Sequence, residues 1–192
     1  METLIQLDKS LFLFLNSLHS SYGDTLMWII TSTYTWIPLY ALIVFFIVRK
    51  YKIQAIWIIL FAILSVAASD LISVHLFKEV FCRLRPSHNP EFFGQIHIVN
   101  DYKGGTFGFV SSHAANSFAI AVFTLLIIKR KWYTFSIILW ALIVCYSRIY
   151  LGVHYPADII GGAVIGILNA YLFYKLLNKF FLKKTKLNAR SF

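Results

Sequence analysis

Hydrophobic positions along this chain form long runs that short polar segments separate. The runs extend over about Asp24–Val48, Ile53–Phe77, Ser112–Ile128, Trp132–Ile149 and Pro156–Leu177. A helix that crosses the hydrocarbon core of a bilayer needs about 20 mainly apolar residues, and the third and fourth runs are only just long enough. The pattern predicts an all-α fold, a polytopic bundle of about five transmembrane helices.

The segment 1–19 follows a different pattern. Leu4, Leu7, Leu11 and Leu18 fall on one helical face, and polar side chains interrupt the other faces. The apolar part is short, and the segment lacks the basic start and the small-residue cleavage site of a signal peptide. These features favour an amphipathic helix that lies in the membrane interface. A sixth spanning helix is the alternative.

The composition agrees with a membrane protein. Hydrophobic residues make up 59% of the 192 residues and charged residues only 14%. Because no linker or internal repeat divides the chain, we expect one integral membrane domain over residues 1–192. The net charge of +10 would suggest nucleic acid as the partner of a soluble protein. Here its placement argues for membrane topology, so we expect the lipid bilayer and no nucleic acid as partner. The oligomeric state stays open.

Basic residues gather on one side of the predicted bundle. Of the 18 lysines and arginines, twelve follow the first, third and fifth spans, where none of the 8 acidic residues lies: Arg49, Lys50, Lys52, Lys129, Arg130, Lys131, Lys175, Lys179, Lys183, Lys184, Lys186 and Arg190. By the positive-inside rule this side is cytoplasmic. We therefore predict a multi-pass protein of the inner (plasma) membrane with a cytoplasmic carboxyl terminus. The segments 78–111 and 149–156 then face the periplasmic or outer side.

The polar stretch Ser147–Asp158 lies just before the last predicted helix. Pro156 suits the first helical position, because its missing N–H and fixed φ cost nothing there. His154 then precedes a helix N-terminus, where backbone N–H groups favour an anion. Asp158 in the first turn is placed to reach a ring nitrogen of His154, and Arg148 lies six residues before this histidine. Taken alone, the stretch also fits a polar helix cap.

A second polar cluster follows the second predicted span on the same outward side. Lys78 and Arg85 are seven residues apart, or two helical turns, and therefore share a face if they lie on one helix. Pro86 disfavours the helical region at the preceding residue and should end that helix at Arg85. Basic side chains at a helix end also extend into the interface without any further function.

A third cluster, Ser111-Ser112-His113, opens the third predicted span. Serine is a good N-cap, and the positive end of the helix dipole again favours an anion. A histidine at a helix start is also commonly an interfacial or capping residue. The preceding segment, Gly104–Gly108, lacks the Gly-Lys-Ser/Thr of a Walker loop. We interpret it as turn material beside the site.

Together the three clusters predict a phosphate-binding site at the outer membrane boundary. They hold fixed cations, two histidines, one aspartate and two helix N-termini. Metal-dependent phosphatases need several carboxylates, and only Asp158 is well placed here. We therefore expect neither a metal nor a cofactor. The combination suits phosphoryl transfer through a covalent histidine intermediate.

These residues resemble the three signature motifs of the type 2 phosphatidic acid phosphatase superfamily. The motifs read Lys78, six residues, Arg85-Pro86; then Ser111-Ser112-His113; then Ser147-Arg148, five residues, His154, three residues, Asp158. The resemblance covers about residues 78–166, including the order of the motifs. It departs from the family at Ser112, where the family usually has glycine.

The resemblance implies a role for each motif residue. His154 is the nucleophile that takes the phosphoryl group, and Asp158 orients its ring. His113 protonates the leaving oxygen and then acts as the base on the incoming water. The remaining side chains bind the phosphate, together with backbone N–H groups near the second motif: Lys78, Arg85, Ser111, Ser112 and Arg148.

The resemblance implies hydrolysis of a lipid phosphate or diphosphate by an integral membrane phosphatase. Undecaprenyl diphosphate, the phosphates of lipid A, phosphatidylglycerophosphate and phosphatidic acid all suit a site beside the headgroups, and the sequence does not rank them. A lipid phosphotransferase that passes the same phosphohistidine to another lipid is an alternative. A non-enzymatic membrane protein whose outer charges only bind anions is a third possibility.

Some polar and small residues lie outside the three motifs or their predicted roles. Asp70 falls within the second predicted span, where a carboxylate is either functional or paired with a neighbouring helix. Gly162 and Gly166 form a small-xxx-small pair, which is typical of close helix packing. Arg83 and Lys103 are candidates for binding a second phosphate or a head group.

Overall fold

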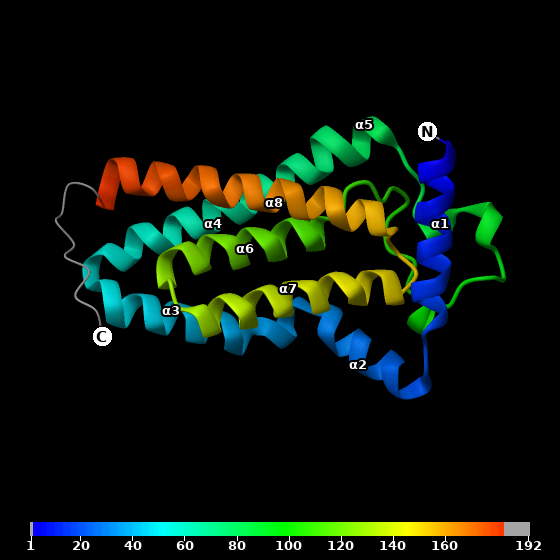
Figure 1. The fold of residues 1–192 in the computed structure, drawn as a ribbon, viewed down its shortest axis with the longest axis horizontal. Helices are drawn as coiled ribbons and strands as arrows, with labels where there is room; N and C mark the ends of the chain where they lie inside the picture. The colour runs from blue at the N-terminus through cyan, green and yellow to red at the C-terminus, as the bar shows by residue number, and fades with distance from the viewer. Residues whose placement is uncertain (1, 183–192) are drawn as a thin grey trace.

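The computed structural model describes residues 2–182, and most of them are helical. Helices α3, α4, α6, α7 and α8 run along the long axis, and α1 crosses one end of this bundle (Figure 1). The helices are α1 (Glu2–Ser17), α2 (Ser21–Thr31), α3 (Ile37–Tyr51), α4 (Ala55–Leu71), α5 (Glu79–Phe81), α6 (Ser112–Ile128), α7 (Lys131–Tyr150) and α8 (Pro156–Leu177). Within residues 2–182 the only β-type pairing is an isolated bridge between Leu84 and Phe107. The all-α prediction is confirmed.

Three continuous helical segments are long and apolar enough to cross a membrane: Thr33–Phe81, Lys131–Tyr150 and Pro156–Phe181. The first of them reverses direction between α3 and α4, where Lys52 has a positive φ of 52°, and so makes two passes (Figure 1). α6 is a shorter apolar helix beside them. Helices α3, α4, α6, α7 and α8 therefore form the bundle that the hydrophobic pattern predicts.

The first predicted span is not one continuous helix. A short 3₁₀ helix over Thr33–Trp36 separates α2 from α3. The Thr35 hydroxyl donates to the carbonyl of Ile29 at 2.6 Å, so a side chain takes a backbone acceptor near the end of α2. Pro38 lies in the first turn of α3, where it is tolerated because it needs no N–H. The prediction of an unbroken helix over 24–48 was wrong for these local reasons.

The second span is longer than predicted and ends before Arg85. A π-helix over Ile72–Lys78 and the short α5 continue α4 as far as Phe81. Cys82 then adopts the left-handed conformation, with φ 47° and ψ 29°, and terminates the helix. The prediction that Lys78 and Arg85 share one helix was therefore wrong. Glycine or asparagine usually marks such a terminus, so the cysteine carried no signal.

α1 lies across the end of the bundle (Figure 1). Its buried Phe12 packs against Phe92 and Tyr155, with ring centroids 5.8 and 5.4 Å apart. Asn16, also buried, donates to two backbone carbonyls at the end of α7 at 2.9 and 3.2 Å. A helix in this orientation is not a sixth helix parallel to the others. The arrangement favours the interfacial amphipathic helix of the two alternatives.

The described turns that carry basic residues lie together at the end of the bundle opposite α1 (Figure 1). The turn after α3 contacts the end of α6, because the Tyr51 hydroxyl donates to the Ile127 carbonyl at 2.8 Å. α8 ends on this side as well. From the predicted basic tail, four residues lie outside the described part of the chain: Lys183, Lys184, Lys186 and Arg190.

The backbones of α6 and α8 approach each other closely at two glycines. A Cβ built at Gly166 would lie 2.2 Å from the Ala115 carbonyl oxygen, and one built at Gly162 would lie 2.4 Å from the Ser111 carbonyl oxygen. Only glycine permits this approach, as the small-xxx-small pattern predicts. The contact joins the start of α8 to the start of α6, where two of the three motifs lie.

We expect Gly166→Ala to destabilise the bundle, because the added methyl group meets backbone rather than a movable side chain. Overpacking of this kind costs about 1–3 kcal/mol. Thermal unfolding of the protein in detergent measures the loss. Gly105→Ala is the control, since nothing lies within 4 Å of a Cβ built there. Equal melting temperatures for Gly166→Ala and the unchanged protein would contradict the close contact.

Candidate active site

The end of the bundle beside α1 brings the three polar motifs together. His154 is 1% exposed, and its Nδ1 lies 3.3 Å from Asp158 Oδ2. The same carboxylate oxygen accepts the Tyr155 backbone N–H at 3.0 Å, which closes a capping box at the start of α8. Pro156 is the first residue of that helix, as predicted. Since Asp158 is fully buried, these bonds fix its orientation and that of the His154 ring.

Arg85 contacts the other ring nitrogen of His154. Its Nη1 lies 3.1 Å from Nε2. A guanidinium can only donate hydrogen bonds, so Nε2 accepts and carries no proton. Nδ1 then holds the proton of the neutral ring and donates it to Asp158. The contacts therefore select the tautomer in which the Nε2 lone pair faces Arg85.

The loop between the second span and α6 positions Arg85. Its backbone N–H donates to the Thr106 carbonyl at 3.1 Å, and its Nε donates to the Phe107 carbonyl at 3.2 Å. The glycine-rich turn packs directly on this side chain. A Cβ built at Gly104 would lie 2.9 Å from Arg85 Nη1, and Gly104 has a φ of +66°. Both the space and the backbone conformation favour glycine at this position.

Lys78 and Ser112 link the second span to α6. Lys78 Nζ donates to Ser112 Oγ at 2.6 Å, and Ser112 Oγ lies 2.6 Å from Ser73 Oγ. Because the Ser73 hydroxyl donates to the Asp70 carbonyl at 2.8 Å, Ser112 is the donor to Ser73. The serine that departs from the family motif thus holds Lys78 in place.

Ser111 and His113 lie at the start of α6. Ser111 is the N-cap, and its Oγ accepts the Ala114 N–H at 3.4 Å. Its own backbone N–H donates to the Asp158 carbonyl at 3.0 Å, so this N–H is used within the protein. His113 is the second residue of α6, so it lies in the turn that this bond joins to the start of α8. The two histidines therefore lie at neighbouring helix starts.

Arg148 is buried at the end of α7, with neutral partners. Its Nη1 donates to Thr31 Oγ1 at 2.5 Å, and its Nη2 donates to the Tyr102 hydroxyl at 3.4 Å. Its Nε has no hydrogen-bond partner among the described residues. Neither Thr31 nor Tyr102 could be predicted as a partner, because neither residue type nor spacing relates them to the motifs.

Positive charge dominates the site. Lys78, Arg85 and Arg148 form no ion pair with a carboxylate in the part of the chain that the structure describes. An uncompensated buried charge costs several kcal/mol, and an anion bound among the three cations offsets that cost. Burial, followed by the charges of Arg85 and Arg148, lowers the pKa of His154 well below its usual range. The ring is therefore neutral at neutral pH.

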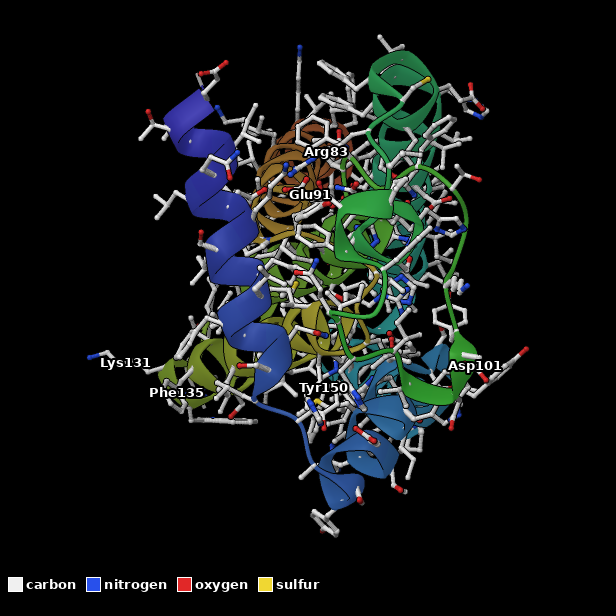
Figure 2. All side chains as sticks on the ribbon, turned by 90° about the vertical axis from the view of Figure 1, so that its right-hand side faces the viewer. Arg83, Glu91, Asp101, Lys131, Phe135 and Tyr150 are labelled. Atoms are coloured by element: carbon white, nitrogen blue, oxygen red, sulfur yellow. The ribbon has the colours of Figure 1, made fainter. Side chains whose placement is uncertain are left out.

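The sequence did not predict the ion pairs of Arg83. Its Nη1 donates to Asp158 Oδ1 at 3.0 Å, and its Nη2 donates to Asp8 Oδ2 at 2.7 Å. Figure 2 shows Arg83 beside α1 at this end of the molecule. Since two of its N–H groups bond to carboxylates, Arg83 is a weaker candidate for binding a second phosphate. The one sequence signal was Asp8, which interrupts the apolar pattern of the first helix.

Two other polar residues lie apart from the histidines. Asp70 accepts a hydrogen bond from Asn116 of α6 at 3.1 Å, so the interpretation as a partner of a neighbouring helix has structural support. Lys103 borders a separate hollow of about 190 Å³ with Ser87 and Phe93. His154 does not line this hollow.

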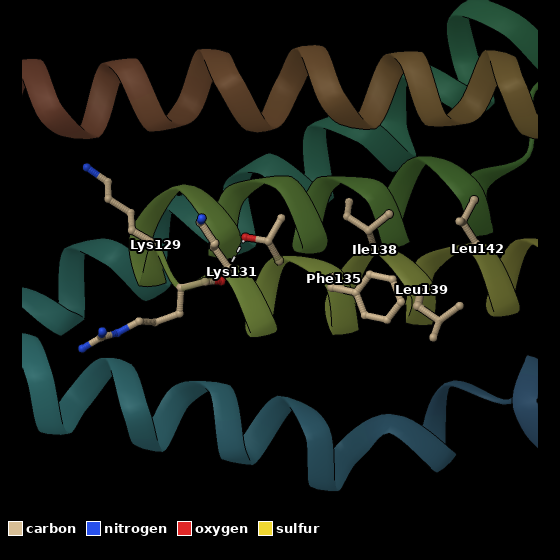
Figure 3. A pocket seen from close by; sticks show the side chains of 8 residues that line it. Lys129, Lys131, Phe135, Ile138, Leu139 and Leu142 are labelled. Carbon is tan, nitrogen blue, oxygen red and sulfur yellow. Dashed lines mark hydrogen bonds between the residues drawn. The ribbon is translucent and has the colours of Figure 1, made fainter.

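A separate hollow borders the basic turn between α6 and α7 (Figure 3). It is a groove of about 530 Å³ lined by Lys129, Arg130, Lys131, Thr134, Phe135, Ile138, Leu139 and Leu142. None of these lining residues is a histidine or a carboxylate, and its surface is mainly the apolar face of α7. The groove lacks groups for phosphoryl transfer, so the site lies at the other end.

Known proteins resemble this chain over most of its length. The sequence profile of the PAP2 superfamily matches residues 55–182. A lipid A 4'-phosphatase of Bacteroides thetaiotaomicron is 37% identical over 182 residues, 93% of this chain and 80% of that protein. The Porphyromonas gingivalis protein of the same name is 36% identical over 177 residues, 92% and 75% of the two chains. A solved PAP2-type phosphatidylglycerolphosphate phosphatase of Bacillus subtilis shares the fold, with a TM-score of 0.71, 22% identity, and 94% and 89% coverage.

A bundle of apolar helices with an oriented histidine beside a buried arginine, in a chain with such relatives, defines an integral membrane phosphatase. The chain belongs to the PAP2 superfamily. The resemblance of its three motifs to type 2 phosphatidic acid phosphatases is thereby confirmed, and so is its assignment as a hydrolase.

We expect the His154 ring to stay neutral well below the pH at which an ordinary imidazole, with a pKa of about 6.5, becomes protonated. Nuclear magnetic resonance of the protein with nitrogen-labelled histidine rings measures this directly in detergent. The His154 signals should keep the Nδ1–H tautomer at about pH 5.5, and His154→Gln identifies them by their loss. Protonation of this ring near the ordinary pKa would contradict the burial and the cationic surroundings.

Proposed function

We propose that this phosphatase hydrolyses a phosphate ester of lipid A through a phosphohistidine formed on His154. One observation carries the proposal: the buried Arg85 and Arg148 and the half-buried Lys78, none of them paired with a carboxylate in the described residues, lie at the same end of the bundle as a neutral, oriented imidazole. Such surroundings favour a dianionic phosphate and leave Nε2 as the nucleophile. The first step forms a P–N bond and breaks the P–O bond to the lipid.

The side chains have complementary roles in this proposal. Asp158 stabilises the positive charge that develops on His154 as the P–N bond forms. Arg85 moves its hydrogen bond from Nε2 to the phosphate oxygens. His113 protonates the leaving lipid oxygen, then removes a proton from the water that attacks the phosphohistidine. Inorganic phosphate leaves, and His154 returns to its neutral form.

The oxygens of the transferred group are bound by the cations and by hydroxyl groups. Lys78, Arg85 and Arg148 neutralise the phosphate charge. Ser112 holds Lys78 at 2.6 Å, and the Ser111 hydroxyl retains a hydrogen for donation. No step needs a metal or a cofactor, because the cations act where a metal ion would otherwise stabilise charge.

Lipid A is the proposed substrate because of the relatives. Two proteins named lipid A 4'-phosphatase are 37% and 36% identical over more than nine-tenths of this chain. Among the lipid phosphates that suit a site at the membrane boundary, this similarity favours lipid A over undecaprenyl diphosphate, phosphatidylglycerophosphate and phosphatidic acid. A sugar phosphate of this kind releases a poor alkoxide leaving group, which fits the need for an acid at His113.

We propose that the site faces the periplasm from the inner membrane and that residues 1–192 act as one domain. The support is the placement of basic residues at the end of the bundle opposite His154, which the positive-inside rule assigns to the cytoplasm. The carboxyl terminus is then cytoplasmic. α1 lies in the outer interface, where it covers the end of the bundle (Figure 1).

The two histidines should respond differently to substitution. With lipid A in EDTA-containing detergent, His154→Ala should abolish both phosphate release and phosphoenzyme formation, because no acceptor for the phosphoryl group remains. His113→Ala should slow hydrolysis by about 10²–10⁴-fold, the usual contribution of general acid catalysis. It should slow phosphorylation by an activated aryl phosphate much less, since that leaving group needs no proton.

Three outcomes would contradict these assignments. Phosphoenzyme in His154→Ala, but not in His113→Ala, would reverse the two histidine roles. Activity that EDTA removes and a divalent ion restores would rule out metal-free chemistry. Hydrolysis of the other candidate lipid phosphates, with none of lipid A, would replace the substrate while leaving the mechanism in place.

The membrane orientation predicts a pattern of chemical labelling. In a variant without the two native cysteines, Glu91→Cys should react with an impermeant thiol reagent in cells whose outer membrane has been permeabilised. Lys131→Cys, at the basic end of the bundle, should react only after the inner membrane is disrupted. Both positions are exposed in the structure. The opposite pattern would place the site on the cytoplasmic side.

A further inference from the structure

A continuous chain of charge-assisted hydrogen bonds connects α1 to the histidine. Asp8 of α1 accepts from Arg83 Nη2 at 2.7 Å, and Arg83 Nη1 donates to Asp158 Oδ1 at 3.0 Å. The other oxygen of Asp158 faces His154 Nδ1. Hydrogen bonds between ionised groups are among the strongest in proteins. The N-terminal helix is therefore linked to the reacting ring through two intermediate side chains.

Arg83 determines how the Asp158 carboxylate is oriented. It is the only hydrogen-bond partner of Asp158 Oδ1 among residues 2–182. Its guanidinium carbon lies 4.0 Å from the centroid of the Tyr155 ring, within the range of a cation–π contact. The Tyr155 ring and the bond to Asp158 Oδ1 hold the guanidinium in place. The Asp158 carboxylate is thereby held in the orientation that points Oδ2 toward His154.

Asp8 fixes Arg83 relative to the same helix end that carries Asp158. Its Oδ1 accepts the Ala157 backbone N–H at 2.8 Å, in the first turn of α8. The Asp8 side chain is 11% exposed, so the ion pair is largely shielded from solvent. Asp8 also neutralises part of the positive charge of Arg83. The negative charge of Asp158 is therefore less compensated by Arg83 and interacts more strongly with the His154 ring.

We propose that Arg83 and Asp8 are positioning residues for the nucleophile and that α1 is part of the active site. The inference rests on the proposed function of His154. The pair holds Asp158 so that Nδ1 stays protonated and Nε2 faces the phosphate. Its loss should slow phosphoryl transfer without weakening phosphate binding, because the cations that bind phosphate are not involved.

Lys9 provides a matched control on the same helix. It forms an ion pair with Glu91 at 2.5 Å, and neither residue contacts Asp158 or His154. Lys9→Gln therefore removes a neighbouring anchor of α1 while the bonds to Asp158 stay intact. A variant that acts only by loosening α1 should behave like Lys9→Gln.

Single-turnover phosphorylation by radiolabelled lipid A in detergent micelles tests the proposal. Arg83→Gln and Asp8→Asn should lower the maximal rate of phosphoenzyme formation by about 10- to 100-fold, the loss typical when an outer partner that orients a metal-bound histidine is removed. The lipid concentration at half-maximal rate should change little. Arg83→Lys should restore part of the rate, because lysine keeps the charge but lacks the two-pronged geometry. Lys9→Gln should remain near the unchanged protein.

Magnetic resonance of nitrogen-labelled histidine rings gives a second readout that needs no substrate. Arg83→Gln should lose the fixed Nδ1–H tautomer of His154, whereas Lys9→Gln should retain it. The proposal is overturned if Arg83→Gln and Asp8→Asn match Lys9→Gln in both measurements. It is also overturned if they raise the half-maximal lipid concentration and leave the rate unchanged, since Arg83 would then bind substrate.

The same experiments separate this proposal from the proposed function. Phosphoenzyme in His154→Ala would refute the nucleophile itself. An unchanged protein that is inert toward lipid A would refute the substrate, while the tautomer measurement on Arg83→Gln would still decide the positioning role.

Discussion

The close contact between α6 and α8 determines where both histidines lie. Gly162 and Gly166 let the α8 backbone rest against carbonyl oxygens of the opposite helix. At the same place the Ser111 N–H donates to the Asp158 carbonyl at 3.0 Å, so the first turns of the two helices are joined directly. A displacement by one helical turn, about 5.4 Å, would separate His113 from His154. The packing of these glycines within the bundle thus sets the distance between the two histidines at its end.

Uncharged hydrogen-bond partners within the protein hold the cations of this site. Lys78 bonds to a serine, Arg85 to backbone carbonyls and the histidine, and Arg148 to a threonine and a tyrosine. These partners fix the positions of the cations without cancelling their charge. A carboxylate in their place would compete with phosphate. Asp158 contacts the ring nitrogen of His154 that faces away from Arg85, and it pairs with Arg83.

The sequence predicted those features that local signals determine. The bounds of α6 and α8 agree with the predicted runs residue for residue, because Ser111 and Pro156 are local signals for a helix start. The prediction of one helix over Lys78–Arg85 was wrong, since nothing in the sequence marks Cys82 as a residue with a left-handed backbone conformation. Contacts between segments far apart in the chain produce no periodic pattern in the sequence. Arg83 meets Asp8 and Asp158 across 75 residues in each direction, and only the folded chain shows this.

The break between α2 and α3 places a helix end against the buried Arg148. Thr31, the last residue of α2, accepts a hydrogen bond from Arg148 through its hydroxyl. The carboxyl end of a helix carries about half a negative charge, because its peptide dipoles are aligned. If α2 and α3 formed one continuous helix, its carboxyl end would lie at the opposite membrane surface, far from Arg148. The interruption instead supplies the guanidinium with a partial countercharge that cannot take up a proton.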